Sequence, residues 1–396
     1  MNPKLEALQP YPFERLNALR AGITPNGAYP HTALSIGEPK HAAPAFVIEA
    51  LTDAEALTTD IGVYPATRGS EDLRETISTW LEARFEARTD PNSEVLPVAG
   101  TREALFSFAQ AVTGRKPDPV VVIPNPFYQI YEGACLLAGA QPWFVNASRD
   151  NDYQGDFESI PEAIWKRTEL LYLCSPGNPT GKVVPGPTQR WLIEQAHRYD
   201  FVIAADECYS EIFQTTPPTG LLSVSNAMGN PHYARCVVFH SLSKRSSLPG
   251  LRSGFVAGDS RVLSDYFLYR TYEGCALPAH TQRVSALAWA DEQHVRENQA
   301  AYRAKFNATV PLLKNHLDLY LPDGGFYLWA HTEGDDTKFA AELFRDCNIS
   351  VLPGSFLARE WRGENPGASH VRIALVAPVA DCVVAAERIA KWLEAR

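Results

Sequence analysis

The amino-acid sequence predicts an α/β fold in two domains. Between residues 94 and 258, seven short runs of apolar residues follow one another, and helical segments separate most of them. Such alternation indicates a sheet that is covered by helices. The chain has 396 residues, more than one ordinary hydrophobic core organises, so two domains are expected. Apolar and charged residues make up 45 % and 21 % of the chain, as in ordinary globular proteins.

Composition argues against several classes of partner. The net charge of −10 disfavours nucleic acid and anionic membrane surfaces. No stretch reaches the roughly 18 apolar residues of a membrane helix, and the N-terminus lacks the apolar segment of a secretory signal. Seven scattered cysteines without a C-x-x-C motif indicate reduced thiols and a cytoplasmic location. No metal ligands are assigned.

The N-terminal quarter is expected to contain an arm and a long helix. Residues 1–45 are rich in Pro and Gly, with a short helical segment near Phe13–Ala21. A helix is predicted from Glu71 to about Ala87, because its apolar residues recur at spacings of three and four. The seven strand-like runs that follow are Glu94–Val98, Pro119–Ile123, Pro142–Val145, Leu170–Cys174, Phe201–Ala205, Cys236–Ser241 and Arg252–Gly258.

The C-terminal third is predicted to combine long helices with short strands. Residues 278–316 are mainly helical in pattern and could bridge two domains. Three further strand segments are expected, at Leu321–Trp329 (a turn and then a strand), Ile349–Pro353 and Ser369–Leu375.

The stretch His240–Arg252, H-S-L-S-K-R-S-S-L-P-G-L-R, carries the strongest chemical signal. Lys244 stands at the mouth of an apolar strand, and a lysine is rarely placed there without a partner or a function. Ser241, Ser243 and Arg252 offer hydroxyl and guanidinium donors that suit a phosphate dianion. An amine beside a phosphate site suits a phosphorylated aldehyde cofactor, pyridoxal phosphate. The alternative is a solvated loop of Lys, Arg and Ser.

Three other positions combine polar groups with apolar segments. Gly100 and Thr101 open an amphipathic helix, whose first N–H groups form a ready anion site. Asp206 ends a buried strand, the edge at which open α/β sheets bind ligands. Arg372 lies inside an apolar strand, where its charge requires an anion. A strand-capping aspartate and a surface-facing arginine are the alternatives for the last two.

These motifs resemble a known family. Ser241-Leu-Ser-Lys-x4-Pro-Gly-x-Arg-x-Gly254 resembles the signature of the class I/II aminotransferases of pyridoxal-phosphate fold type I, and Asn178-Pro-Thr-Gly is similar to a second family motif. The resemblance extends from Gly37 to Arg372. It implies a large domain with a mostly parallel seven-stranded sheet containing one reversed strand, and a smaller α+β domain built from both chain ends. The implied divisions are 1–45 (arm and part of the small domain), 46–280 (large cofactor-binding domain) and 281–396 (small domain).

The resemblance also implies a role for individual residues and a homodimer. Lys244 would hold the cofactor as a Schiff base and later move a proton, Asp206 would pair with the pyridine nitrogen, and Tyr209 would reach the phenolate oxygen. Asn125–Pro126 is a candidate cis bond. Tyr64 would reach the phosphate of the neighbouring subunit's cofactor. The implied cofactor-binding residues are Tyr64, Gly100, Thr101, Arg102, Tyr128, Asn178, Asp206, Tyr209, Ser241, Ser243, Lys244 and Arg252, and the implied substrate-binding residues are Gly37, Asn178 and Arg372. Arg102 departs from the family, which more often has a small or amide residue there.

Within the family, three stretches resemble bacterial succinyldiaminopimelate transaminases of lysine biosynthesis: H-S-L-S-K-R-S-S-L-P-G-L-R-S-G-F-V-A-G-D, V-Y-P-A-T-R-G-S-E-D-L-R and V-A-G-T-R-E-A-L. These enzymes exchange an amino group between glutamate and N-succinyl-2-amino-6-oxopimelate, and both substrates carry a second carboxylate. Arg68, Arg102 and Arg245 are the candidate partners for it, unranked by the sequence. Aminotransferases for aspartate, aromatic or alanine-like substrates remain alternatives, as do a pyridoxal-phosphate β-lyase and a non-catalytic regulator of the same fold. The missing G-x-G-x-x-G fingerprint argues against a dinucleotide-binding protein.

Overall fold

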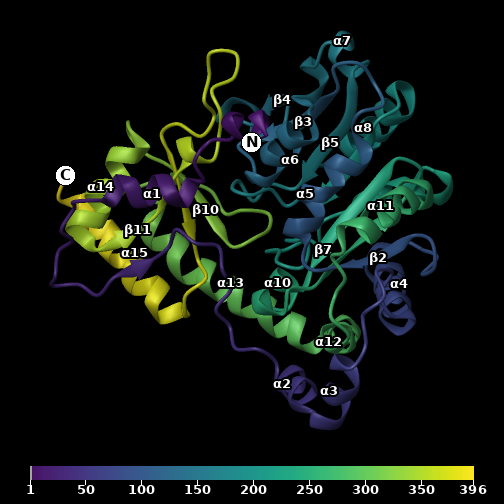
Figure 1. Cartoon of the computed structure of the whole chain (residues 1–396). Helices are drawn as coiled ribbons and strands as arrows, with labels where there is room; N and C mark the ends of the chain where they lie inside the picture. The colour runs from purple at the N-terminus through teal and green to yellow at the C-terminus, as the bar shows by residue number, and fades with distance from the viewer. Residues whose placement is uncertain (1) are drawn as a thin grey trace.

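The computed structural model describes residues 2–396 and shows a large sheet and a small sheet, each packed against helices (Figure 1). No helix within the described part of the chain is both long and apolar enough to cross a membrane. The cytoplasmic location stays a prediction.

The large sheet has the seven strands that the sequence predicts. Its strands stand in the order β2-β8-β7-β6-β5-β3-β4, and β8 runs antiparallel to both neighbours while the other pairs are parallel. The expected mostly parallel sheet with one reversed strand is therefore confirmed. The bounds are β2 (Val95–Val98), β3 (Val120–Asn125), β4 (Gln141–Asn146), β5 (Thr168–Cys174), β6 (Val202–Asp206), β7 (Cys236–Ser241) and β8 (Gly254–Gly258).

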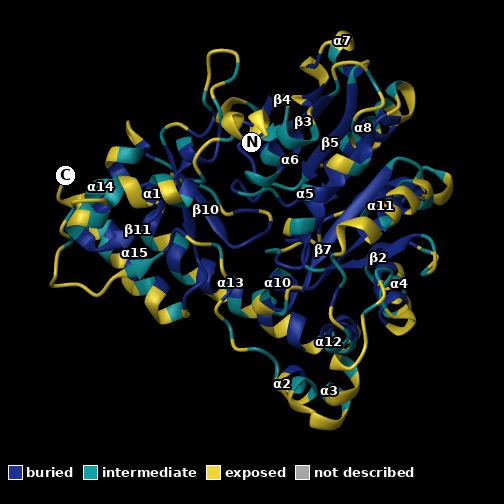
Figure 2. Ribbon diagram, in the orientation of Figure 1, coloured by how far each residue is buried: buried dark blue, intermediate teal, exposed yellow. Residues whose placement is uncertain are grey.

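Helices cover both faces of this sheet because the strands are apolar on both sides. In β5, Leu170 and Tyr172 enter one hydrophobic core, whereas Leu171 and Leu173 enter another, as the two-residue period of a strand requires. The strands are almost entirely buried, and exposed residues lie on the outer helix faces (Figure 2). The first core includes residues of α5 (Thr101–Val112), α6 (Ile130–Ala138) and α11 (Ser260–Glu273); the second includes residues of α4 (Glu71–Phe85), α8 (Gly186–Tyr199), α9 (Leu221–Ala227) and α12 (Ala279–Ala290).

The small sheet is antiparallel and belongs to the C-terminal part of the chain. Its strands stand in the order β12-β13-β10-β9. Its own hydrophobic core joins the strands to helices that include α14 and α15. The bounds are β9 (Asp318–Leu319), β10 (Tyr327–His331), β12 (Leu352–Pro353), β13 (His370–Ala374), α14 (Asp336–Cys347) and α15 (Val379–Glu394).

The N-terminal arm joins this C-terminal part. Strand β1 (Thr32–Ala33) pairs in parallel with β11 (Ile349–Ser350), and α1 (Pro12–Arg20) packs against α14 and β12. The smaller α+β unit is thus built from both chain ends, as expected. One strand prediction was wrong in detail: Ile349–Pro353 is not one strand, because β11 pairs with β1 while β12 pairs with β13 in a different sheet. The division at residues 45 and 280 stays a prediction.

Helices also link the two sheets. Helix α13 (Gln293–Leu313) follows α12 and runs from the large-sheet region to the small one (Figure 1), where it packs against α15. The helices α2 (Ala45–Thr52) and α3 (Ala54–Ile61), which the sequence did not predict, pack against α12. The remaining short elements are α7 (Glu162–Trp165), α10 (Leu242–Arg245), η1 (Pro3–Ala7), η2 (Arg149–Asn151), η3 (Phe157–Ser159), η4 (Pro231–Tyr233), η5 (Pro249–Leu251) and η6 (Gly354–Phe356).

Candidate active site

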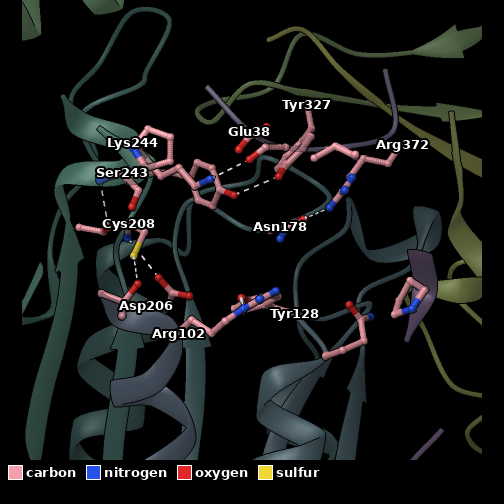
Figure 3. Close-up of a pocket in the computed structure, with 18 of the residues that line it drawn as sticks. Glu38, Arg102, Tyr128, Asn178, Asp206, Cys208, Ser243, Lys244, Tyr327 and Arg372 are labelled. Atoms are coloured by element: carbon pink, nitrogen blue, oxygen red, sulfur yellow. Dashed lines mark hydrogen bonds between the residues drawn. The ribbon is translucent and has the colours of Figure 1, made fainter. Parts of the chain in front are cut away.

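A cavity of about 450 Å³ lies where the carboxyl ends of β6 and β7 face β13 and the arm. This is the edge at which open α/β sheets bind their ligands. The cavity brings together most of the residues that the sequence singles out (Figure 3). Those that line it are Gly37, Thr101, Arg102, Tyr128, Asn178, Asp206, Tyr209, Ser241, Ser243, Lys244, Arg252 and Arg372.

Lys244 projects into this cavity from α10, directly after β7. Its Nζ donates a hydrogen bond to the Gly37 carbonyl at 2.8 Å, and it lies 5.1 Å from the ring centroid of Phe326. Burial lowers the pKa of Lys244 to about 8, and the nearby Arg372 and Arg252 charges act in the same direction. A reactive neutral amine is therefore populated near physiological pH.

Asp206 ends β6 with its side chain in the cavity and is 5 % exposed. Its Oδ2 accepts a hydrogen bond from the Tyr131 hydroxyl at 2.7 Å, and its Oδ1 accepts one from the Cys208 N–H at 3.2 Å. These two donors hold the carboxylate in one orientation. The sequence analysis missed Tyr131 and Cys208: Tyr131 lies on α6, which gave no sign of pointing toward Asp206.

Donors suited to a phosphate lie at and near the N-terminus of α5. Helix α5 begins at Thr101, and its cap Gly100 has a φ of +90°, a conformation that glycine adopts at little cost. A Cβ on Gly100 would lie 2.4 Å from Arg252 Nη2. Glycine is thus required for the guanidinium to approach the helix N-terminus, and the Ser241 and Ser243 hydroxyls line the same cavity.

Arg372 enters the cavity from the small sheet and is 4 % exposed. One guanidinium nitrogen donates to Asn178 Oδ1 at 2.9 Å, and the other donates to the Ser35 carbonyl at 2.8 Å. Its Nε is buried without a hydrogen-bond partner. No carboxylate of residues 2–396 forms an ion pair with this guanidinium, so its charge is available to an anion in the cavity.

Two tyrosines that line the cavity contact each other. The hydroxyls of Tyr209 and Tyr327 are 3.1 Å apart, and in Figure 3 Tyr327 stands between Lys244 and Arg372. Its ring centroid lies 4.3 Å from the Arg372 guanidinium carbon. A Cβ on Gly37 would lie 1.8 Å from the Tyr327 hydroxyl oxygen, so only glycine fits here. The sequence analysis did not identify Tyr327.

Arg102 is a further cation that lines the cavity, besides Lys244, Arg252 and Arg372. Its Nε donates to the Tyr128 hydroxyl at 2.7 Å, and one terminal nitrogen donates to the Tyr11 hydroxyl at 2.9 Å. Neither partner is a carboxylate. The Arg102 side chain is therefore directed toward Tyr128 (Figure 3) and toward Tyr11, which precedes α1.

The two other candidate arginines lie outside the cavity. Arg245 is buried and contacts the Ala288 carbonyl and the Glu292 carboxylate. Arg68 donates to the Asn92 carbonyl and stacks on Phe267. Neither guanidinium lines the cavity.

Tyr64 is the one predicted cofactor-binding residue that the structure places far from the others. Its side chain is fully exposed in the loop after α3, and it does not line the cavity. The expected contact with a neighbouring subunit's cofactor stays a prediction. The predicted cis peptide bond at Asn125–Pro126 is confirmed.

The donor set fits pyridoxal phosphate. One cavity contains the Lys244 amine with its lowered pKa, the oriented Asp206 carboxylate, and the N-terminus of α5 with the Arg252 guanidinium beside it. They match the aldehyde, the ring nitrogen and the phosphate of that cofactor, respectively.

If Lys244 captures the cofactor, as the sequence predicts, its low pKa should make the capture depend on pH. Only the neutral amine attacks an aldehyde, and its population grows until the pKa of about 8 is passed. We expect the rate at which the cofactor-free protein captures pyridoxal phosphate to rise about tenfold per pH unit below pH 8 and to level off above it. Stopped-flow absorbance would measure this rate. A rate that keeps rising to pH 10 would mean that Lys244 has an ordinary pKa.

Comparison with known proteins agrees with this site. The chain matches the class I and II aminotransferase family over residues 30–389. It is 29 % identical over 397 residues to an LL-diaminopimelate aminotransferase of Nitratidesulfovibrio vulgaris (strain DP4), with 98 % of each chain covered. A solved aminotransferase of Neisseria meningitidis Z2491 has a TM-score of 0.94 and 45 % identity, covering 99 % of this chain and 100 % of that one. A probable N-succinyldiaminopimelate aminotransferase of Thermus thermophilus has a TM-score of 0.84 and 26 % identity, covering 96 % and 99 %. The chain belongs to the class I and II aminotransferases and is a pyridoxal-phosphate-dependent enzyme.

Proposed function

We propose that this aminotransferase moves the amino group of glutamate to N-succinyl-2-amino-6-oxopimelate, in the diaminopimelate route of lysine biosynthesis. The observation that carries this proposal is Arg102, a cation in the cavity with no carboxylate partner, in addition to Arg372. Each proposed substrate carries at least one carboxylate besides the one next to the reacting carbon, so a site for them needs a second such cation. The likeness to the two diaminopimelate-type aminotransferases supports the same substrate class.

In this proposal Arg372 binds the carboxylate next to the reacting carbon. Its guanidinium is already oriented by Asn178 and Ser35, so little conformational freedom is lost when the substrate binds. A bidentate pair fixes the direction of the substrate backbone relative to Lys244. Asn178 and Tyr209 lie beside this pair and complete the walls of the cavity.

Lys244 and Asp206 carry the chemistry of the proposal. Pyridoxal phosphate, when bound, supplies the aldehyde that accepts the amino group and a ring that withdraws electrons. Lys244 Nζ, in its neutral form, takes the proton from the substrate α-carbon. It then delivers this proton to the carbon that was the aldehyde carbon of the cofactor. Asp206, held by Tyr131 and Cys208, keeps a proton on the ring nitrogen.

Arg102 would bind the distal carboxylate. The other two candidate arginines do not line the cavity. Arg245 forms an ion pair with Glu292, and Arg68 donates a hydrogen bond to the Asn92 carbonyl. Tyr128 and Tyr11 orient the Arg102 guanidinium without neutralising it. A carboxylate that approaches it would gain a charge-assisted hydrogen bond.

We expect Arg102→Leu to discriminate between substrates by their charge. The KM for 2-oxoglutarate and for the succinylated oxo acid should rise by about 10- to 100-fold, since a charge-assisted hydrogen bond is lost. The KM for pyruvate, which has one carboxylate, should change little. Arg68→Leu serves as the matched control and should leave all three unchanged. Equal losses for pyruvate and 2-oxoglutarate would remove Arg102 from substrate recognition.

A second candidate substrate is LL-diaminopimelate itself. It carries a distal ammonium group, and the exposed Glu38 carboxylate on the rim of the cavity forms no ion pair with any of residues 2–396. The relative from Nitratidesulfovibrio vulgaris is named an LL-diaminopimelate aminotransferase. Aspartate, aromatic or alanine-like substrates would use the same cofactor residues, and so would β-elimination. These reactions differ from the proposed one in the oxo acid that is accepted or the product that is released.

The test is spectroscopic. The purified protein, loaded with pyridoxal phosphate, should show a visible band that glutamate bleaches. Separate addition of oxo acids then asks which one restores the band. Restoration by the succinylated oxo acid supports the proposal, and bleaching by LL-diaminopimelate in place of its succinylated form favours the second candidate. Restoration only by oxaloacetate or phenylpyruvate would refute the lysine-pathway substrate, and release of pyruvate without an acceptor would indicate a β-lyase.

We propose further that two copies of the chain share their active sites. Exposed apolar side chains lie on α2, on α3 and its following loop, and on α11 and α12, namely Ile48, Ile61, Val63, Tyr64, Leu268, Tyr272 and Leu287. Helix α12 packs against α2 and α3, so part of this surface is continuous. We propose that a second copy covers this surface and that its Tyr64 reaches the phosphate site of the first copy.

Mixing two inactive variants tests this sharing. Tyr64→Ala and Lys244→Ala should each weaken or abolish activity, for different reasons. In a hybrid dimer, one site combines the intact Lys244 of one subunit with the intact Tyr64 of its partner. We expect mixing after dissociation to restore a measurable fraction of wild-type kcat. A mixture no more active than its parts, in hybrids verified by native mass spectrometry, would show that sites are not shared.

A further inference from the structure

Helix α13 carries a buried lysine that has no carboxylate partner. Lys305 is 1 % exposed, and no Asp or Glu of residues 2–396 forms an ion pair with it. Its Nζ lies 2.7 Å from His41 Nε2 and donates to the Val376 carbonyl at 3.1 Å. Its ammonium also lies 4.6 Å from the ring centroid of Tyr302. A buried cation held only by neutral groups is costly, so its placement calls for an explanation.

His41 connects Lys305 to Asn298, and Asn298 connects to the active-site lysine. Asn298 Nδ2 donates to the main-chain carbonyls of Lys244 at 3.1 Å and Arg245 at 3.0 Å. Asn298 Oδ1 lies 2.6 Å from His41 Nδ1. Asn298 and Lys305 are seven residues apart on one face of α13, and His41 reaches them from the N-terminal arm.

The hydrogen-bond partners at both ends of this chain of contacts determine which atom donates and which accepts in each contact. Carbonyl oxygens only accept hydrogen bonds, so the amide nitrogen of Asn298 must face the two carbonyls. Its oxygen therefore faces His41, and His41 Nδ1 must carry a proton. In a neutral ring Nε2 is then an acceptor, and it accepts from Lys305, which can only donate. Burial and the Lys305 charge lower the pKa of His41, in agreement with a neutral ring.

Both the main chain and the side chain of Lys244 are held by hydrogen bonds near this chain of contacts. Asn298 fixes the Lys244 carbonyl, while Lys244 Nζ donates to the carbonyl of Gly37. Gly37 lies four residues before His41, so the same stretch of the arm is held by the lysine side chain and by the histidine ring. The arrangement couples the arm, α13 and α10 at the residue that carries the amine.

We propose that Lys305, His41 and Asn298 form a positioning relay for Lys244: Lys305 selects the His41 tautomer, His41 orients the Asn298 amide, and Asn298 holds the Lys244 backbone. None of the three lines the cavity, so they act through Lys244 and not on the substrate. This inference rests on the proposed role of Lys244 as the cofactor-bearing lysine.

Two substitutions of His41 separate the relay from simple structural support. In His41→Asn, an amide nitrogen takes the place of Nδ1, so the donor to Asn298 is kept while the acceptor for Lys305 is lost. In His41→Gln, an amide oxygen takes the place of Nε2, so Lys305 keeps its acceptor while Asn298 loses its donor. Asn298→Leu removes the contact with Lys244 altogether. Thr309→Val is the control, because Thr309 is fully buried on the same helix and its hydroxyl donates only to the Lys305 carbonyl.

Three quantities should be measured for each protein: the Kd for pyridoxal phosphate, the pH midpoint of the bound cofactor's visible absorbance, and the Tm. We expect Asn298→Leu and His41→Gln to raise the Kd by about tenfold and to shift the midpoint. His41→Asn should keep Kd and midpoint near the wild-type values while its Tm falls, because Lys305 loses its acceptor. Thr309→Val should lower only the Tm.

The outcomes distinguish this inference from the proposed function. If wild-type absorbance titrates with pH but His41→Asn and His41→Gln show the same Kd and midpoint, the relay is refuted and the role of Lys244 stands. The relay is also refuted if Kd and midpoint follow the Tm across all four variants. If loaded wild-type protein has no titrating band, or if Lys244→Ala keeps it, the role of Lys244 fails and the relay fails with it.

Discussion

Lys244→Ala is expected to abolish transamination, with kcat falling by at least about 10⁴-fold, because in the proposed function one amine serves as both the covalent anchor of the cofactor and the base. The visible band of the lysine-bound cofactor should disappear and be replaced by the spectrum of free pyridoxal phosphate. Cofactor can still bind through Thr101, Ser243 and Arg252, so equilibrium dialysis should detect a weaker but measurable affinity.

Lys244→Arg is the matched control for charge. It keeps a cation in the cavity but offers no attacking amine, so its loss of activity should be as large as that of the alanine variant. If Lys244→Arg retained substantial activity, the amine would not be the reacting group.

The fold of Lys244→Ala can be verified through its pH-dependent stability. The pKa of Lys244 is about 8 in the folded chain, against an ordinary value of 10.5. The unfolded chain therefore binds more protons between these values, and the stability of the wild-type apoenzyme should rise with pH across that window. The rise in stability with pH should be weaker in the alanine variant. Burial also lowers the pKa of Lys305 to about 8, so Lys305 should account for part of the pH dependence that the variant keeps. Thermal unfolding from pH 7.5 to 10.5 would measure the difference.

Arg372→Leu is expected to have the second-largest effect, on substrate binding. The KM should rise by on the order of 10²- to 10³-fold for every amino acid and oxo acid, because a buried charge-assisted pair with the carboxylate is lost. Cofactor affinity should remain within about twofold, since Arg372 donates to Asn178 and Ser35 and lies away from the N-terminus of α5. Steady-state kinetics and cofactor titration separate the two effects.

Two further arginine variants give the controls for Arg372→Leu. Arg372→Lys keeps the charge but loses the two-pronged geometry, so its KM should fall between wild type and the leucine variant. Arg359→Leu removes a partly buried ion pair with Glu132 outside the cavity and should lower the Tm without changing the KM. An unchanged KM in Arg372→Leu would refute the assignment of this arginine to the carboxylate.

The large sheet could be predicted from the sequence because its signals are local. Each strand is a short β-branched or aromatic run, and the structure moves the predicted limits of the seven runs by only a few residues. The motifs that bear Lys244, Asp206 and Arg372 are also local, and each stands at a strand end or within a strand. The presence of one reversed strand came only from the family resemblance, and the order of the strands and the reversal of β8 came only from the structure, since periodicity says nothing about which strands are neighbours.

The contacts that the sequence did not reveal join residues far apart in the chain. Tyr131 holds Asp206, 75 positions away, and Tyr327 meets Tyr209, 118 positions away. Neither tyrosine differs in sequence from an ordinary core aromatic residue, which is the commoner role. Arg102 shows the same limit: its position after Gly100-Thr101 indicated an anion site, but only the fold shows that its guanidinium meets Tyr11 and Tyr128. The splitting of Ile349–Pro353 between two sheets likewise depends on which distant strands are available for pairing.

The position of Arg372 on the small sheet and of Arg102 on α5, beside the large sheet, has a mechanical consequence. In the proposed function, a substrate whose carboxylates are held by both arginines acts as a removable cross-link between two hydrophobic cores that belong to different sheets. A ligand that binds only when the two cores are folded and in contact with the shared cavity stabilises that state by mass action. Saturating substrate analogue should therefore raise the cooperativity of unfolding as well as the Tm, so that the two cores melt together. The small molecule on which the enzyme acts would then serve, for the duration of each turnover, as part of its architecture.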